Sequence, residues 1–148
     1  EISCSLVGSE MCIRDSISSK GYIAELLADV GLSAADKKKV KHFSVGMKQR
    51  LGIALALVGN PELVLLDEPI NGLDPQGIAE IREMIIKLNK EKGITFIISS
   101  HILGELSKIA TSFGIIDKGE LKKQILKTAL TEDLEEYYLS LTGGISND

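Results

Sequence analysis

The chain has 148 residues, of which 44% are apolar, 26% charged and 4% aromatic, and it has no tryptophan. This composition is typical of one soluble domain and excludes a disordered, collagenous or fibrous chain. The net charge of −4 and the pI near 5.3 argue against a bare nucleic-acid-binding surface, which needs clustered positive charge. The longest apolar run, residues 51–59, is well short of the ~18 residues of a spanning helix. We therefore expect any role at a membrane to depend on a partner.

The N-terminal segment carries an unusual signal. Residues 6–16, LVGSEMCIRDS, are what a DNA string resembling a transposase-type sequencing adapter would encode. We expect residues 1–16 to be adapter-derived and exclude them from fold reasoning. The alternative is a polar, flexible N-terminal tail. Both cysteines lie in this segment, and with only two histidines elsewhere the chain lacks the ligands for a zinc site or a disulfide framework.

Two helices are predicted in residues 17–60. Apolar residues recur at helical spacing from Ile23 to Val30, and Gly31 is placed to end that helix in the left-handed conformation. The lysine-rich run 37–42 is expected to be a solvated turn rather than a phosphate-binding patch.

The second of these helices follows Ser44. Residues 47–58 are apolar on almost every side, which predicts a helix buried between two layers. Gly59 and Pro61 are expected to stop it.

The next aliphatic run, residues 63–66, predicts a parallel strand covered on both faces. It leads into Asp67 and Glu68. Residues 78–88 then predict an amphipathic helix and residues 94–98 a second buried strand, so the three elements form a right-handed parallel βαβ unit.

The C-terminal part is expected to contain a helix over residues 102–110, a hairpin with strands 113–116 and 120–124, and a last helix around residues 134–141. The predicted organisation is therefore an adapter-derived tail (1–16), a helical subdomain remnant with the following helix (17–60), an enzymatic core (61–124), and a C-terminal helix and tail (125–148).

Two acids at the end of a buried strand have two interpretations. They are either structural carboxylates with a helix-cap partner, or a site that holds a divalent cation and activates water. The polar His101 after the next strand favours the second interpretation. In that case Asp67 binds Mg²⁺, Glu68 polarises the attacking water, and His101 hydrogen-bonds the transferring phosphoryl group.

Four motifs in this order resemble those of the ATP-binding cassette family. Residues 43–50, FSVGMKQR, are similar to its signature sequence, residues 63–68 to its Walker B strand, residues 71–74 to its D-loop, and His101 to its switch histidine. The resemblance covers about residues 21–121. It implies an α/β fold of the P-loop NTPase type, with a parallel sheet and crossover helices, that is incomplete because its N-terminal half is missing.

The resemblance also implies an ATPase in which two cassettes sandwich two ATP molecules. Each nucleotide lies between the phosphate loop of one subunit and the signature sequence of the other. In this chain Ser44, Val45, Gly46 and Met47 would then bind nucleotide, and Asp74 would carry information across the dimer. The Ser44 hydroxyl and the backbone N–H groups at a helix N-terminus are suited to bind the negatively charged terminal phosphate of that nucleotide.

The sequence departs from the family pattern in several places. Val45 stands where glycine is usual and would restrict how closely the backbone approaches phosphate, while Met47 replaces the usual glutamine and Ile70 the commoner threonine. No G-x-x-x-x-G-K-[S/T] phosphate loop occurs, and no glutamine precedes Gln49. We therefore expect the second half of a nucleotide-binding domain, whose parent is an ATPase although this chain alone is not.

Within the family, residues 43–54 and 99–103 resemble ATP-binding subunits of bacterial exporters linked to bacitracin and lantibiotic self-protection. This implies a transmembrane permease, a second nucleotide-binding domain, no nucleic acid, and a place at the cytoplasmic face of the plasma membrane. The alternatives are a chromosome-maintenance or repair ATPase, which would bring long heptads that are absent here, and a translation factor with a second cassette. A non-catalytic interaction module is disfavoured by the presence of Glu68.

Overall fold

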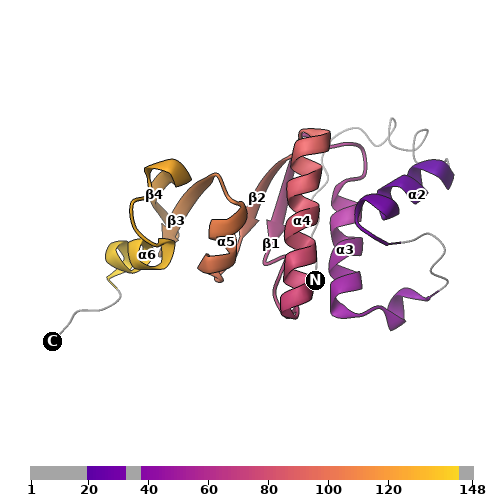
Figure 1. The fold of residues 1–148 in the computed structure, drawn as a ribbon, viewed down its shortest axis with the longest axis horizontal. Helices are drawn as coiled ribbons and strands as arrows, with labels where there is room; N and C mark the ends of the chain where they lie inside the picture. The colour runs from indigo at the N-terminus through magenta and orange to yellow at the C-terminus, as the bar shows by residue number, and fades with distance from the viewer. Residues whose placement is uncertain (1–19, 33–37, 144–148) are drawn as a thin grey trace. The chain divides into compact units, whose positions relative to one another are not determined.

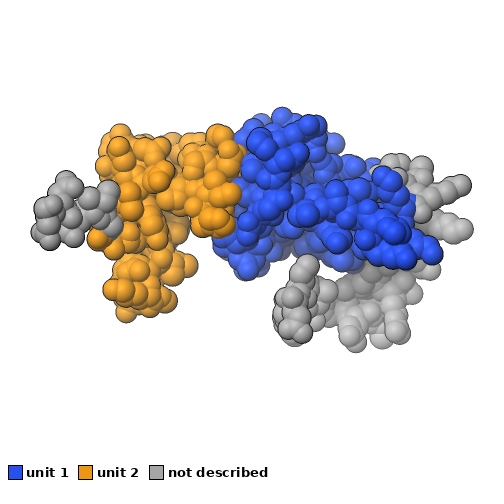
Figure 2. All heavy atoms as spheres, turned by 90° about the horizontal axis from the view of Figure 1, so that it is seen from below, with its two compact units in different colours: residues 1–99 blue, residues 100–148 orange. Residues whose placement is uncertain are grey.

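The computed structural model describes residues 20–32 and 38–143. By its contacts the chain divides into two compact units, residues 1–99 and 100–148, which are coloured separately in Figure 2. The predicted adapter-derived segment 1–16 lies outside the described residues. The elements of Figure 1 are α2 (Lys20–Asp29), η1 (Val40–His42), α3 (Val45–Ala56), β1 (Leu63–Asp67), α4 (Pro75–Lys92), β2 (Thr95–Ser99), α5 (Leu103–Ile109), β3 (Ser112–Asp117), β4 (Glu120–Leu126), η2 (Lys127–Ala129) and α6 (Leu134–Thr142).

The two helices predicted in residues 17–60 are present and pack against each other. Helix α2 is followed by Gly31 at φ +68°, the left-handed conformation that the sequence predicted there. Helix α3 begins after Ser44, whose side chain caps it, and Gly59 follows its last turn at φ +84°. The described part of the basic run, residues 38–42, is exposed and includes η1, as expected of a solvated turn.

The βαβ unit is confirmed. Strands β1 and β2 pair in parallel, with Leu65 opposite Ile97, and α4 connects them and packs on β2. Helix α4 begins at the Asp74 cap with proline at its first position and ends at Gly93, which has φ +68°. Sequence signals at both ends thus set the length of this crossover helix.

The prediction that these strands are covered on both faces is wrong for the described residues. One face of β1 is buried, with Val64 and Leu66 pointing inward, but the other exposes Leu63 at 48% and Leu65 at 70%. Ile97 of β2 lies opposite Leu65 and is 55% exposed. An unbroken aliphatic run indicates that both faces avoid water, and the described part of the chain contains cover for only one.

The same physical reason applies to α3, which was predicted to be buried between two layers. Ile53 and Ala54 are buried, whereas Leu55 is 63% exposed. Helix α3 therefore has one covered face among the described residues.

Residues 100–148 form the second unit. Strands β3 and β4 make the predicted antiparallel hairpin, with a register shift between Ile115 and Ile116, and its turn places Lys118 and Gly119 at positive φ. Helices α5 and α6 pack against each other. Within residues 20–32 and 38–143, no helix combines the length and the apolar character that crossing a bilayer requires.

Candidate functional site

The acid pair lies where β1 ends. Asp67 is the last residue of the strand and is exposed, on the same face as Leu65. Glu68 follows with φ +46°, a left-handed conformation that non-glycine residues rarely adopt. Pro69 comes next and is fully buried. A residue before proline normally prefers extended backbone, so the left-handed φ of Glu68 is also unusual for its position before Pro69. Such conformations cost on the order of 1 kcal/mol or more, and they concentrate at functional sites.

Ser99 of β2 contacts both acids. Asp67 and Ser99 are register partners, and the Ser99 hydroxyl donates a hydrogen bond to Asp67 Oδ1 at 2.5 Å. The backbone N–H of Glu68 donates to Ser99 Oγ at 3.1 Å and to the Ser99 carbonyl at 3.1 Å. One serine thus links the strand that carries the acid pair to the neighbouring strand.

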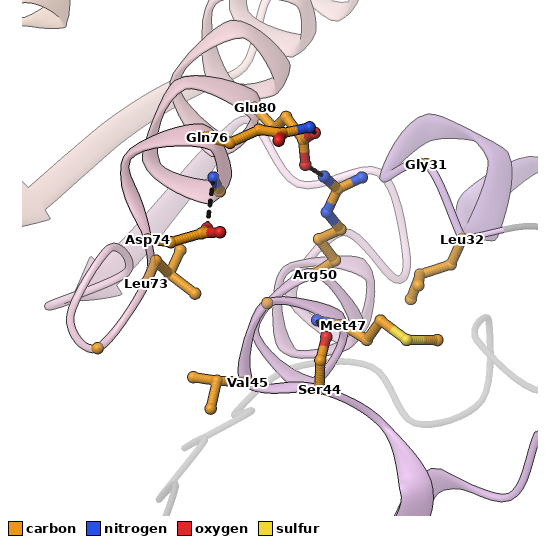
Figure 3. Close-up of a pocket in the computed structure, with 13 residues that line it drawn as sticks. Gly31, Leu32, Ser44, Val45, Met47, Arg50, Leu73, Asp74, Gln76 and Glu80 are labelled. Atoms are coloured by element: carbon orange, nitrogen blue, oxygen red, sulfur yellow. Dashed lines mark hydrogen bonds and ion pairs between the residues drawn. The ribbon is translucent and has the colours of Figure 1, made fainter.

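A pocket of about 580 Å³ lies in the first unit (Figure 3). Four segments form it: the turn after α2, the first turns of α3, the loop before α4, and the first turns of α4. Its lining residues are Gly31, Leu32, Ser44, Val45, Gly46, Met47, Arg50, Gly72, Leu73, Asp74, Gln76, Gly77 and Glu80.

Both helices that open into the pocket are capped by a side chain that lines it. Ser44 Oγ accepts a hydrogen bond from Met47 N at 3.2 Å, and Asp74 Oδ1 accepts one from Gly77 N at 2.9 Å. The remaining N–H groups of a helix N-terminus favour negative charge. The Ser44 hydroxyl accepts from the helix and carries a proton of its own that it can donate to a further acceptor.

The structure thus brings the predicted site residues into two groups. Ser44, Val45, Gly46, Met47 and Asp74 all line the pocket. Asp67 and Glu68 are not among the residues that line the pocket. They form the second group, in which each is hydrogen-bonded to Ser99.

His101 belongs to the second unit, where it is exposed and precedes α5. Sequence reasoning missed Arg50 and Glu80, which form an ion pair in the wall of the pocket, and it also missed Ser99. Arg50 is part of the signature-like motif and Ser99 stands two residues before His101, so the sequence motifs could have pointed to both residues. Nothing in the sequence pattern indicated which residues they contact.

The carboxylates of the acid pair are ligands of the kind that hold Mg²⁺ when the ion is also bound to the phosphates of a nucleotide. Among the residues that the structure describes, no cluster of three or more His, Cys, Asp or Glu side chains forms a cage for a metal. Mg²⁺ at phosphate sites is held by one or two carboxylates together with phosphate oxygens and water. The exposed carboxylate of Asp67 is chemically suited to that role.

The chain is similar to ATP-binding proteins of ABC transporters. The sequence model of the ABC transporter family matches residues 5–71. The chain is 54% identical over 109 residues to the bacitracin transport ATP-binding protein BcrA of Bacillus licheniformis, a match covering 74% of this chain and 36% of the relative. It is 50% identical over 122 residues to the lantibiotic transport ATP-binding protein SrtF of Streptococcus pyogenes, covering 81% and 52%. The chain thus spans about a third to a half of the length of these relatives.

Solved structures of ABC transporter components are also similar to this chain. CbiO1 from Clostridium perfringens, part of the ABC transporter complex cbiONQ, matches with a TM-score of 0.68 and 28% identity over 78% of this chain and 49% of the other. The ADP conformation of MJ1267, an ATP-binding cassette of an ABC transporter, matches with a TM-score of 0.63 and 25% identity, covering 82% and 45%.

Proposed function

This chain belongs to the ATP-binding cassette family of ABC transporters, and from that premise we propose that its parent protein is the ATP-hydrolysing subunit of a bacterial exporter. The substrate class we propose is a drug or an antimicrobial peptide, because bacitracin and lantibiotic transport proteins are among the relatives. The partners are a transmembrane permease and a second nucleotide-binding domain, and the protein works at the cytoplasmic face of the membrane.

The observation that carries the proposal is the pocket between α3 and α4. It collects all five of the predicted nucleotide-binding residues, from Ser44 to Met47 and Asp74, although the two segments are far apart in sequence. Two capped helix N-termini open into it, so it suits the terminal phosphate of a nucleotide held by the second domain.

Gly46 supports the same assignment. Its φ is not left-handed, and a Cβ added there would lie 3.6 Å from Leu73 Cδ2, an ordinary contact. The chain itself therefore has no steric need for glycine at this position. Close approach of a ligand to the backbone supplies a reason. Val45 is 57% exposed at the rim and narrows that approach.

The acid pair supplies the hydrolytic chemistry. Glu68 orients and polarises the attacking water, and Asp67 provides the carboxylate of the Mg²⁺ site. When bound, Mg²⁺ neutralises charge that develops on the phosphates. His101 hydrogen-bonds the transferring phosphoryl group, a role carried by its resemblance to the switch histidine.

Residues 1–148 alone should neither bind ATP tightly nor hydrolyse it, because the sequence has no phosphate loop and no lysine of that loop. Isothermal titration calorimetry with ATP and Mg²⁺ tests this. Micromolar affinity of the 148-residue chain would overturn this part of the proposal.

A chimera tests the rest. The part of B. licheniformis BcrA that precedes its matched region replaces the residues of this chain that precede the match, because the two proteins are 54% identical where they overlap. We expect Mg²⁺-dependent ATP hydrolysis and ATP-dependent dimerisation in gel filtration. A folded chimera that binds ATP but neither dimerises nor hydrolyses it would contradict the proposed function.

A further inference from the structure

Ser99 makes a set of contacts that the family motifs do not account for. Its hydroxyl donates to Asp67 Oδ1 and accepts from the backbone N–H of Glu68, while its carbonyl accepts from the same N–H. The two residues to which we assign metal binding and water activation are thus held by one side chain on the neighbouring strand.

The bond to Asp67 fixes one oxygen of the carboxylate. A carboxylate bonded at one oxygen cannot turn freely about its last torsion, and a hydrogen bond to a charged group is stronger than one between neutral groups. Because Asp67 and Ser99 are register partners in a parallel pair, the β1–β2 ladder fixes the donor as well as the acceptor.

The bond from Glu68 concerns its backbone. Glu68 has φ +46° and precedes a proline, so its conformation is disfavoured twice over. The two oxygens of Ser99 hold its N–H at 3.1 Å each. The direction in which the Glu68 side chain leaves the backbone depends on that φ, so the serine acts on the side chain through the main chain.

We propose that Ser99 is a positioning residue for hydrolysis, which orients the Asp67 carboxylate toward the nucleotide-bound metal and stabilises the left-handed backbone of Glu68. This inference rests on the proposed function. In this role Ser99 does not contact substrate. It differs from a serine that only stabilises the strand, because its loss should change the acid pair as well as the stability of the fold.

Thr95 provides a matched control. It lies on β2 four residues earlier, on the same exposed face, and also carries a hydroxyl. Thr95→Ala removes that hydroxyl from the same strand without touching the acid pair. Ser99→Thr is the conservative variant, because it keeps the hydroxyl and a β-branched residue suits a strand.

The first experiment uses the 148-residue chain without nucleotide and measures amide hydrogen exchange by NMR. Ser99→Ala removes the hydroxyl acceptor of the Glu68 N–H and keeps the backbone carbonyl, so it should speed exchange of that amide several-fold, whereas Ser99→Thr and Thr95→Ala should leave it unchanged. An unprotected Glu68 amide in the parent chain, or equal exchange in Ser99→Ala and the parent, would overturn the proposal.

The second experiment uses the chimera. Ser99→Ala should lower kcat roughly tenfold, the value of one hydrogen bond to a charged group, and raise the Mg²⁺ concentration needed for tight ATP binding in calorimetry. The KM for ATP at saturating Mg²⁺ should stay within about twofold, because the phosphate loop is untouched. Ser99→Thr should restore kcat and the Mg²⁺ requirement.

The outcomes separate this inference from the proposed function. A chimera that is inactive even with Ser99 in place contradicts the proposed function, while the exchange experiment still decides whether Ser99 holds Glu68. An active chimera in which Ser99→Ala and Thr95→Ala behave alike, or in which Ser99→Thr fails to rescue, contradicts the positioning role alone.

Discussion

Arg50 of α3 and Glu80 of α4 form an ion pair in the wall of the pocket (Figure 3). The Arg50 guanidinium also donates to the Val30 carbonyl at 3.4 Å, and the second oxygen of Glu80 accepts from Gln76 Nε2 at 3.0 Å. A single arginine thus links the end of α2, the first half of α3 and the start of α4, which together form three sides of the pocket.

Replacing Arg50 by methionine should therefore lower the free energy of unfolding. We expect a loss of about 1 kcal/mol, because the pair is only partly shielded, with side-chain exposures of 21% and 42%. Urea denaturation measures it. Lys48→Met is the control, since Lys48 is an exposed basic residue on the same helix, and an equal loss there would contradict the role of the pair.

Gly31→Ala should destabilise the chain by more than backbone strain alone. Gly31 has φ +68°, and a Cβ there would lie 2.6 Å from Arg50 Nη1. Gly59 has φ +84° but no heavy atom within 4 Å of such a Cβ, so Gly59→Ala measures the strain by itself, about 1 kcal/mol. The excess at Gly31 should disappear when Arg50 is methionine. Equal losses at the two glycines would show that the arginine yields without cost.

In the chimera, Glu68→Gln should bind ATP normally and lower turnover by roughly 10²–10⁴-fold, because it removes the group that we propose polarises the attacking water. The bound ATP should then hold the dimer closed. Asp67→Asn should instead weaken binding in a Mg²⁺-dependent way. Steady-state hydrolysis and calorimetry separate the two, with the exposed Glu62→Gln as control. Parental turnover in Glu68→Gln would remove that residue from the mechanism.

Ser44→Arg should leave ATP binding by one chimera subunit intact but prevent ATP-driven dimerisation, because the long side chain would fill the pocket that we propose receives the partner's nucleotide. Gel filtration with and without ATP tests this. Val40→Arg adds the same side chain at a 53% exposed position outside the pocket and should dimerise like the parent. Normal dimerisation of Ser44→Arg would mean that this pocket does not face the second subunit.

The exposed face of β1 and β2 predicts self-association of the 148-residue chain, since contiguous apolar surface of this kind is sticky in water. Leu65→Lys with Ile97→Lys should shift the sedimentation profile toward monomer. Ile23→Lys, at an exposed position on α2, should not. Association that is unchanged in the double variant would place the sticky surface elsewhere.

Much of the fold could be predicted because its signals are local. Ser44 precedes α3 and caps it, and the helical spacing of residues 78–88 identified α4, although the Asp74 cap at its start was not predicted. The run of aliphatic residues before Asp67 identified the strand, and its connection through one helix to β2 fixed the parallel pairing.

The exposed faces and the long-range pairs were beyond the sequence for different reasons. The pattern at Leu65 reports that a residue avoids water, not whether its cover lies in the described part of the chain. The partners of Arg50 and Ser99 lie 30 and 32 residues away, on other elements. Side-chain contacts at such separation depend on how helices and strands pack, which periodicity does not encode.

The side chain that caps α4 also lines the pocket, which couples the first turn of α4 to whatever contacts Asp74. Asp74 Oδ1 holds the Gly77 N–H, and a Cβ on residue 77 would lie 2.8 Å from that oxygen, so a larger residue there would require the carboxylate to shift. Any ligand or neighbouring subunit that draws this carboxylate away also releases the first turn of α4. Binding of another group to the Asp74 carboxylate and opening of the first turn of α4 are therefore thermodynamically linked. A measurement of either one reports on the other.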